Sequence, residues 1–382
     1  MNRYVPKRRF KGFTGQWEES EFGKETDVRD GTHDSPKYVS QGYPLITSKN
    51  VGDGKINFEE IQFISEEDYN IINKRSKVEK GDILMGMIGT IGNMAIVKET
   101  PEYAIKNVAL IKKTKSINVD FIYNLLNSRF IISQIEKKLD GGTQKFLALN
   151  KIRELKILLP SHSEQKLIGL FFKNLDEQID KQGKKAEKLK NLKKAYLSEM
   201  FPAEGVQVPK RRFKGFTEPW KQRKLGEVAV VNSGKDYKHL EVGEIPVYGT
   251  GGYMISVNKA LSYKNDAIGI GRKGTIDNPF ILRAPFWTVD TLFFIFPKEM
   301  YELYFLYNIF EKINWNSKDE SSGIPSLSKK IIEDTIYFFP TIEEQKLIGS
   351  FFKKLDDEIN LEQKRLEKLK QLKQAYLEEM FV

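Results

Sequence analysis

Three glycines have the spacing of a cofactor-binding motif. Residues 269–274 are GIGRKG, a GxGxxG pattern that binds a dinucleotide phosphate when it lies between a strand and a helix. The segment TIDNPF follows, and its Pro279 prevents a helix from starting there. The pattern therefore predicts a tight loop. Arg272 and Lys273 at its tip are candidate DNA contacts, with plain solvated charges as the alternative.

Other catalytic motifs are incomplete. Residues 277–280 are DNPF, which resembles the D/N-P-P-Y/F tetrapeptide of amino-methyltransferases, but Asn278 stands where that motif has proline and no matching cofactor loop is evident. His33 is one of three histidines and lacks the companions that a metal site needs. No GxxxxGK[ST] phosphate loop occurs in the sequence. We therefore expect no catalytic site, no metal and no cofactor in this chain, and a turn-stabilising or DNA-proximal role for His33.

Composition is typical of a soluble protein with several domains. The 382 residues allow about two or three domains. The chain has no cysteine, which suits a reducing cytoplasm, and it lacks both an apolar run long enough to span a membrane and a secretory signal. Of the net charge of +10, residues 1–15 carry five basic groups and no acid, whereas residues 16–162 carry 21 of each sign. Net charge alone therefore does not make the large blocks DNA-binding domains.

The chain contains a tandem duplication. KRRFKGFT occurs at residues 7–14 and again at 210–217, and the 39-residue segment 163–201 matches 343–381. The matched segments imply that both copies perform the same function, whereas the blocks between them differ in sequence and length. We expect an N-terminal arm (1–17), a first variable domain (18–162), a central spacer helix (163–201), a linker and repeated arm (202–220), a second variable domain (221–342) and a C-terminal spacer helix (343–382).

Each long matched segment predicts an amphipathic helix. Apolar residues recur at spacings of three and four, namely Ile168, Phe172, Leu175, Ile179, Ala186, Leu189, Leu192 and Tyr196, with matching positions in the second copy. Each helix could reach roughly 55 Å. Two matched apolar stripes in one chain favour an intramolecular coiled coil over two surface helices. Antiparallel pairing follows if a pseudo-twofold axis relates the two copies. Strand-like runs broken by glycine predict that the variable blocks are α/β domains.

These features together resemble the specificity subunit of type I restriction–modification enzymes. The resemblance rests on RFKGFT-x-x-W, on the long EQKLIG…EMF segments and on repetition of the whole unit, with DGTHDSPKY at 30–38 as a further partial match. It implies an α+β fold in which two α/β target recognition domains form a tandem pseudo-twofold repeat, separated and joined by two long helices in an antiparallel coiled coil.

The resemblance also implies a division of labour. Each recognition domain would read one half of a bipartite, asymmetric site in double-stranded DNA. The helices would set the spacing and dock two methyltransferase subunits, and two restriction subunits would translocate and cleave DNA. S-adenosylmethionine, ATP and magnesium would bind those partners, and this chain would perform no chemistry. Two rival interpretations remain, a coiled-coil scaffold without DNA specificity and a self-contained restriction-type methyltransferase.

Candidate site residues follow from this interpretation. Proteins recognise bases with side chains that offer two hydrogen-bonding groups and that lie on exposed loops. They contact phosphates with lysine, with hydroxyl groups and with backbone amides at glycine-rich turns. The candidate DNA contacts are His33, Lys37, Lys49, Asn50, Thr143, Gln144, Lys145, Lys235, Tyr248, Arg272, Lys273, Ser322 and Gly323. The candidate subunit-docking residues are Phe171, Phe172, Tyr196, Phe351, Phe352 and Tyr376.

For the other basic and aromatic residues, two roles remain possible. The lysines between 184 and 194 form a solvated face or contact phosphate along the DNA. Trp17 and Trp220 are expected to be core anchors rather than base-stacking residues. The arginines of the two arms, Arg8, Arg9, Arg211 and Arg212, could point outward to partner subunits or to phosphate.

Overall fold

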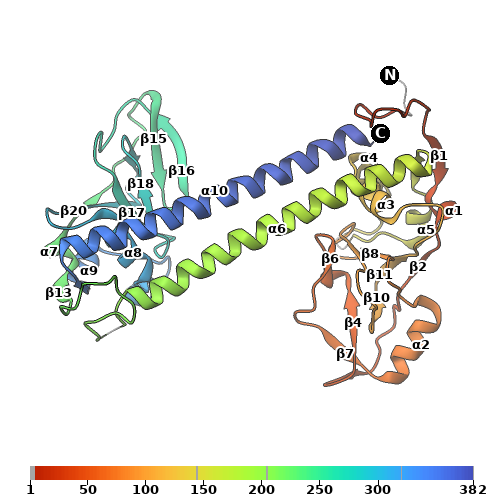
Figure 1. The fold of residues 1–382 in the computed structure, drawn as a ribbon, viewed down its shortest axis with the longest axis horizontal. Coiled ribbons are helices and arrows are strands. Elements are labelled where there is room, and N and C mark those ends of the chain that lie inside the picture. The colour runs from red at the N-terminus through yellow and green to blue at the C-terminus, as the bar shows by residue number, and fades with distance from the viewer. Residues whose placement is uncertain (1–4, 143–144, 204, 320, 382) are drawn as a thin grey trace. The chain divides into compact units, whose positions relative to one another are not determined.

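The computed structural model describes residues 5–142, 145–203, 205–319 and 321–381. Its contacts divide the chain into two compact units (Figure 1). Unit 1 comprises Met1–Gln182 and Arg365–Val382, and unit 2 comprises Gly183–Lys364. Each long helix contributes one part to each unit, since the boundaries fall after Gln182 in the first helix and after Lys364 in the second.

Unit 1 is built on two four-stranded sheets. In order, the first contains β2 (Val28–Asp30), β11 (Val108–Ile111), β8 (Ile83–Gly86) and β9 (Met94–Ile96), all antiparallel. The second contains β10 (Ala104–Lys106), β4 (Tyr43–Thr47), β7 (Gln62–Ile64) and β3 (Tyr38–Val39), with β10 and β4 parallel. Two short pairs complete it, β1 (Glu18–Glu21) with β12 (Lys156–Leu159) and β5 (Val51–Gly52) with β6 (Lys55–Ile56).

The helices of unit 1 begin at side-chain caps. Asn118 and Ser128 accept hydrogen bonds from Phe121 N and Ile131 N, which satisfies first-turn amides. The helical elements are α1 (Phe22–Glu25), η1 (Ser48–Asn50), α2 (Glu66–Ser76), α3 (Val119–Leu126), α4 (Arg129–Lys138), α5 (Leu149–Arg153) and the first half of α6 (His162–Met200).

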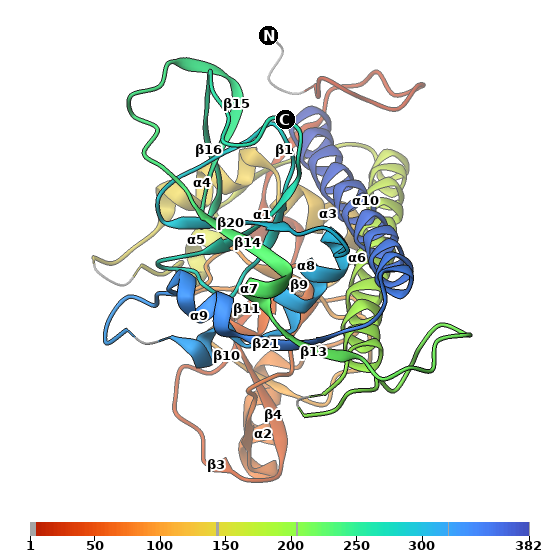
Figure 2. The same ribbon diagram turned by 90° about the vertical axis from the view of Figure 1, so that its left-hand side faces the viewer.

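Unit 2 also contains two sheets, whose labelled strands include β14, β15 and β20 in Figure 2. Its antiparallel sheet contains β14 (Ala229–Ser233), β20 (Leu292–Pro297), β17 (Ala267–Gly271) and β18 (Phe280–Leu282), and a second sheet contains β16 (Gly252–Val257), β15 (Val242–Gly249) and β19 (Trp287–Thr288). The other elements are β13 (Lys221–Lys224) paired with β21 (Ile336–Phe339), α7 (Leu225–Val228), α8 (Leu303–Lys312), η2 (Trp315–Lys318) and α9 (Lys329–Asp334). The second part of α6 and the first part of α10 (Ile342–Met380) also belong to unit 2.

The long helices pack against each other within both units (Figure 1). In unit 1 the rings of Phe171 and Tyr376 lie 4.9 Å apart, and Lys373 Nζ lies 2.6 Å from Asp176 Oδ1. In unit 2 Tyr196 and Phe351 lie 5.1 Å apart, and Lys185 pairs with Glu362 at 2.9 Å. The residue number rises along α6 as it falls along α10, which confirms the predicted antiparallel pairing.

In each unit, shorter helices pack between a sheet and the long helices. In unit 2 Phe305 and Phe310 of α8 share one core with Ile268 and Ile295 of the sheet and with Phe352 of α10. Trp17 and Trp220 are 2% and 1% exposed in the corresponding cores of the two units. The expectation that both tryptophans are core anchors is therefore confirmed.

Candidate nucleic-acid interface

The predicted glycine loop in unit 2 is a tight turn between β17 and β18. Gly274 has φ +96°, which favours glycine, and a Cβ on Gly271 would overlap the carbonyl oxygen of Thr275. Arg272 and Lys273 are exposed at the turn. The backbone N–H of Arg272 donates to Thr291 O at 2.8 Å, so the turn is fixed against the segment 288–291 that connects β19 to β20.

The same connecting segment holds two more of the predicted DNA contacts. The N–H of Lys235 donates to Thr288 O at 2.9 Å, and Val289 N donates to Tyr248 O at 3.0 Å. Lys235 is exposed, and Tyr248 is half-buried with its ring 6.1 Å from Phe280. Segment 288–291 thus brings together residues that lie up to 38 positions apart in sequence, from Lys235 to Lys273.

A second loop, residues 321–327, lies beside the turn. Gly274 N donates to Pro325 O at 2.8 Å, and Leu327 N donates to Arg272 O at 2.9 Å. Asp319 shapes the loop because its Oδ1 accepts from the backbone of Ser326 and Ser321, each at 3.0 Å, and these bonds lower the pKa of its carboxyl. Ser322 and Gly323 are exposed within this loop. All six predicted contacts in unit 2 therefore lie at one edge of the unit.

Unit 1 has a corresponding turn that the sequence analysis missed. Residues 87–93 connect β8 to β9 as 272–279 connect β17 to β18, and the tripeptide GTI at 89–91 recurs at 274–276. That repeated GTI was the available signal. Ile88 forms a β-bridge with Phe146, and Leu147 N donates to Met87 O at 2.9 Å. The exposed Lys145 therefore lies beside this turn, whereas Thr143 and Gln144 are outside the described residues.

The 3₁₀ helix η1 packs against the same turn. Ser48 Oγ accepts from Met87 N at 3.2 Å and donates to Asn107 O at 2.7 Å, and Lys49 beside it is exposed. Asn50 does not fit its predicted role in DNA contact. Its side chain is buried, its Oδ1 accepts from Thr47 N, and its Nδ2 donates to Asn57 O at 3.1 Å, so these groups stabilise the turn.

The remaining two candidates of unit 1 have different surroundings. His33 lies between Asp30 and Asn107, with its Nε2 and Nδ1 each 2.8 Å from an oxygen of those residues. Lys37 is exposed on the segment before β3, where its N–H donates to Asp68 Oδ2 at 2.8 Å at the start of α2. No contact described here links Lys37 to the turn at 87–93.

The predicted docking rings lie inside the protein. Phe172 and Phe352 are 0% exposed in the two cores, so the prediction that they contact a partner subunit is wrong. Apolar spacing shows that a helix face is covered, but not whether another helix of the same chain covers it. Phe171, Tyr196, Phe351 and Tyr376 are half-buried and pack on one another in pairs across the two helices.

Other apolar side chains on the helices are open to solvent. Leu167 and Leu347 are 43% and 47% exposed, and Leu192 and Leu372 are 41% and 43% exposed. Each pair occupies the same position of the duplicated helix, 180 residues apart. These leucines, rather than the phenylalanines, are the repeated apolar positions that a second protein could contact.

The arm arginines hold the arms to the helices. Arg9 donates to both carboxylate oxygens of Glu164, at 2.6 and 2.7 Å, and Arg212 does the same to Glu344, at 2.8 and 2.7 Å. Both carboxylates are 1% exposed. Arg9 and Arg212 therefore do not point outward as suggested. Arg8 and Arg211 are more exposed and pair with Glu379 and Glu199.

Two of the clustered lysines on α6 are engaged in ion pairs. Lys185 pairs with Glu362, and Lys193 lies 2.7 Å from both Glu311 and Asp356. Burial raises the pKa of the Glu311 carboxyl and of the Asp356 carboxyl, and Lys193 opposes that rise in each case. The other lysines of the cluster are exposed and remain candidates for phosphate contact, namely Lys184, Lys188, Lys190 and Lys194.

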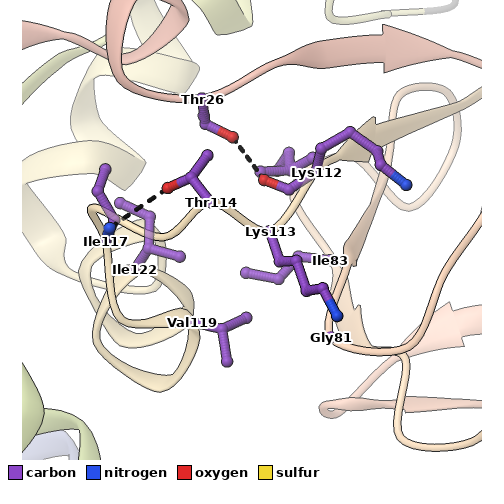
Figure 3. A pocket seen from close by; sticks show the side chains of 10 residues that line it. Thr26, Gly81, Ile83, Lys112, Lys113, Thr114, Ile117, Val119 and Ile122 are labelled. Carbon is purple, nitrogen blue, oxygen red and sulfur yellow. Dashed lines mark hydrogen bonds between the residues drawn. The ribbon is translucent and has the colours of Figure 1, made fainter.

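A small recess in unit 1 is shown in Figure 3. Its lining includes Ile83, Ile117 and Lys113, and Thr26 Oγ1 donates to Lys112 O across it at 2.7 Å. Its volume of about 10 Å³ is that of a single water, so it is too small for a cofactor. In the described parts of the chain no cluster of three or more His, Asp or Glu side chains could hold a metal ion. None of the helices in these parts is both long and apolar enough to cross a membrane.

The sequence and the structure match proteins of known type. The family model described as type I restriction modification DNA specificity domain matches residues 20–191 and again residues 217–371. The chain is 24% identical over 385 residues to the putative type I restriction enzyme MjaX specificity subunit of Methanocaldococcus jannaschii, covering 92% of this chain and 89% of that protein. It is 28% identical to the MjaVIII specificity subunit of the same organism over 48% of this chain, and there it spans only 44% of the relative.

Solved structures show the same fold. A crystal structure of the type I restriction–modification S subunit from M. genitalium superimposes with a TM-score of 0.72 at 18% identity, covering 99% of both chains. A second, titled as the structural basis of complex assembly and conformational transition of the type I R-M system, gives 0.52 at 17% identity, covering 96% of this chain and 97% of that one.

Fold and interface together define a class of protein. Two α/β units in tandem, combined with two long antiparallel helices, are the architecture of type I specificity subunits. The chain belongs to the type I restriction–modification DNA specificity family and carries two copies of its DNA specificity domain.

Proposed function

We propose that each unit reads one half of a bipartite, asymmetric sequence in double-stranded DNA, and that α6 and α10 set the spacing between the halves. The observation that carries the proposal is the edge of unit 2, where segment 288–291 and loop 321–327 surround the exposed Arg272 and Lys273. Arginine and lysine on exposed turns are the side chains that contact guanine edges and phosphates. The two units differ in sequence around their turns, so the two half-sites should differ.

The helices also dock two modification subunits in this proposal. A duplicated surface suits two copies of one partner, and the repeated exposed leucines, Leu167 with Leu347 and Leu192 with Leu372, offer such a surface. The partner subunits would bind S-adenosylmethionine and methylate adenine, and two restriction subunits would use ATP and magnesium. This chain would supply sequence recognition in the cytoplasm without a catalytic step of its own.

Methylome sequencing tests the proposal. A host without other DNA methyltransferases would express this chain with its matching modification subunit, and single-molecule sequencing would map methylated adenines. The expected result is one split, asymmetric motif, and exchange of residues 221–342 for the same block of a relative should change only one half of it. A stable complex with an active partner and no methylated motif would contradict the proposal and favour a protein-binding scaffold.

Matched variants locate the contact surface in unit 2. Arg272→Ala with Lys273→Ala should reduce methylation of the site, since both side chains are exposed at the turn. Arg283→Ala is the control, because this exposed arginine pairs with Asp266 and lies over the ring of Tyr304 of α8, away from the turn. Equal loss of methylation in both variants would count against the turn as the DNA-contacting edge.

A further inference from the structure

Unit 1 contains an open hollow that none of the contacts above explains. Its volume is about 650 Å³, and polar side chains that line it include Thr47, Lys49, Gln62, Glu59, Glu60 and Asn107. Ile88 of the turn between β8 and β9 lies at its border. The hollow is therefore part of the predicted DNA-contacting edge, and most of the side chains that line it are polar.

Asn107 of this lining has a constrained backbone. It connects β10 to β11 with φ +54°, a left-handed conformation that costs a side-chain-bearing residue free energy and that asparagine tolerates better than most. Its N–H donates to Thr32 O at 3.1 Å, and its carbonyl oxygen accepts from Ser48 Oγ at 2.7 Å. An unusual backbone conformation held from both sides is a feature of functional positions.

The side chain of Asn107 is held at one end only. His33 Nδ1 lies within hydrogen-bond distance of Asn107 Oδ1, at 2.8 Å, and His33 Nε2 lies 2.8 Å from Asp30 Oδ2. Arg75 in turn pairs with Asp30. The Nδ2 amide group of Asn107 makes no hydrogen bond to any residue that the structure describes. His33 thus fixes which way the amide faces, and two N–H donors stay available at the hollow.

The charges around the hollow favour a base edge over a phosphate. Glu59 and Glu60 outnumber Lys49, the one basic residue of the lining, and carboxylates repel a phosphate group while they accept hydrogen bonds from base amino groups. An asparagine amide is among the side chains that discriminate bases in the major groove, and each good contact of this kind is worth about 1–3 kcal/mol.

We propose that Asn107 is a specificity-determining residue of unit 1, which donates from Nδ2 to an acceptor on a base edge, purine N7 or O6 or thymine O4, and that His33 positions its amide. This inference rests on the proposed function and deepens it. It changes the role of His33 from a DNA contact to a positioning residue. In unit 2 the corresponding connection between β19 and β20 is the segment that holds Arg272, so both units would read DNA from the same place in the fold.

Asn107→Asp tests the proposal with almost no change in shape. Aspartate keeps an oxygen toward His33, tolerates the left-handed backbone and replaces the two donors with an acceptor. The complex with the modification subunit would methylate the wild-type motif and duplexes that carry each single base-pair change in both halves. Wild type should discriminate at one base pair of the unit 1 half by about 5- to 150-fold, the equivalent of 1–3 kcal/mol, and Asn107→Asp should lose or reverse that preference at this pair alone.

Further variants separate a reading role from a structural one. Asn107→Gly keeps the backbone conformation without the side chain and should give the same local loss. His33→Ala should weaken discrimination partially and at the same base pair, whereas a merely structural histidine would affect the whole half-site. Asn70→Asp, on an exposed position of α2, should discriminate as wild type does.

The possible outcomes are distinct. An Asn107→Asp complex that discriminates at every base pair as wild type does would overturn the inference and leave the proposed function standing. A wild-type complex without any bipartite motif would overturn both. Degeneracy confined to one pair of the unit 1 half, with the unit 2 half intact, is the supporting result.

Discussion

At the scale of single residues, the two repeats are joined to their helices by the same buried ion pair. Glu164 and Glu344 lie in the first turns of α6 and α10, where the helix dipole favours a carboxylate. Each is almost fully buried and receives two hydrogen bonds from an arm arginine. Bidentate arginine–carboxylate pairs are geometrically specific as well as strong. The pair therefore attaches each arm to its helix and also fixes the course of the arm along it.

Loss of one partner should therefore cost more than loss of both. Arg9→Met leaves the carboxylate of Glu164 buried without its partner, and we expect unit 1 to lose about 3–5 kcal/mol of its free energy of unfolding. Arg9→Met combined with Glu164→Gln should recover most of this loss. Hydrogen exchange of peptides from each unit would measure the effect separately in unit 1 and unit 2. A double variant as unstable as the single one would contradict this account.

The two acids that share Lys193, Glu311 and Asp356, make the stability of unit 2 depend on pH. Burial raises the pKa of Glu311 and of Asp356 above their ordinary values of 4.5 and 3.8. The folded state therefore holds these protons more tightly than the unfolded state, so stability falls as the pH rises from about the ordinary carboxyl range through the raised folded-state values.

Glu311→Gln tests this dependence. The variant should melt at a higher temperature than wild type at pH 8, and the difference should shrink as the pH falls toward 4.5, the ordinary value for glutamate. Thermal unfolding of unit 2 across that pH range would measure it. Glu299→Gln, at an exposed position, is the matched control and should follow wild type. In unit 1 Asn127 occupies the place of Glu311, at the end of the matched motifs FIYNLLN and FLYNIFE.

At the scale of secondary-structure elements, apolar spacing predicted most of what was observed. The stripe along residues 168–196 predicted α6 to within one residue at each end, and it predicted the pairing with α10. The stripe could not tell which face the rest of the chain covers, so Phe172 was assigned to a partner although it lies in the core. Asn107 had no signal of its own, because its position depends on φ and on partners from residues 32, 33 and 48.

The lengths of the paired helices make a prediction of their own. Residues 183–189 of α6 face residues 358–364 of α10, as the pairing of Lys185 with Glu362 indicates. Deletion of both segments removes about two helical turns while it preserves the apolar stripe, and shortens each helix by about 10.5 Å. If the helices set the spacing, the gap in the methylated motif should shorten by about three base pairs, at 3.4 Å each.

A deletion in one helix only provides the control for this prediction. Removal of 183–189 alone puts the apolar positions of α6 out of register with α10 and should abolish methylation. An unchanged gap after the double deletion, in a complex that still methylates, would show that the helices do not set the spacing.

At the scale of the whole molecule, the duplication was plain in the sequence, but the division into units was not. The repeats suggested two domains separated by spacer helices. The structure instead forms unit 2 from the continuous stretch Gly183–Lys364 and unit 1 from two separate stretches of chain. Sequence similarity identifies which segments are alike, whereas membership of a compact unit depends on which hydrophobic surfaces meet. Phe381 meets Trp17 and Phe172 at ring distances of 6.2 and 5.7 Å, which no local pattern indicates.

The split composition of unit 1 sets an order of folding during synthesis on the ribosome. Unit 2 is complete once residue 364 has left the exit tunnel, whereas the core of unit 1 stays open beside Trp17 until Leu377, Met380 and Phe381 arrive. Closing that core joins residues more than 360 positions apart, which is slow because of the long loop that must close. A chain stalled at residue 364 should therefore show protease protection of unit 2 and cleavage in unit 1. The half of the molecule that is synthesised first is thus the last to be finished, and premature termination would leave unit 2 folded and unit 1 open to degradation.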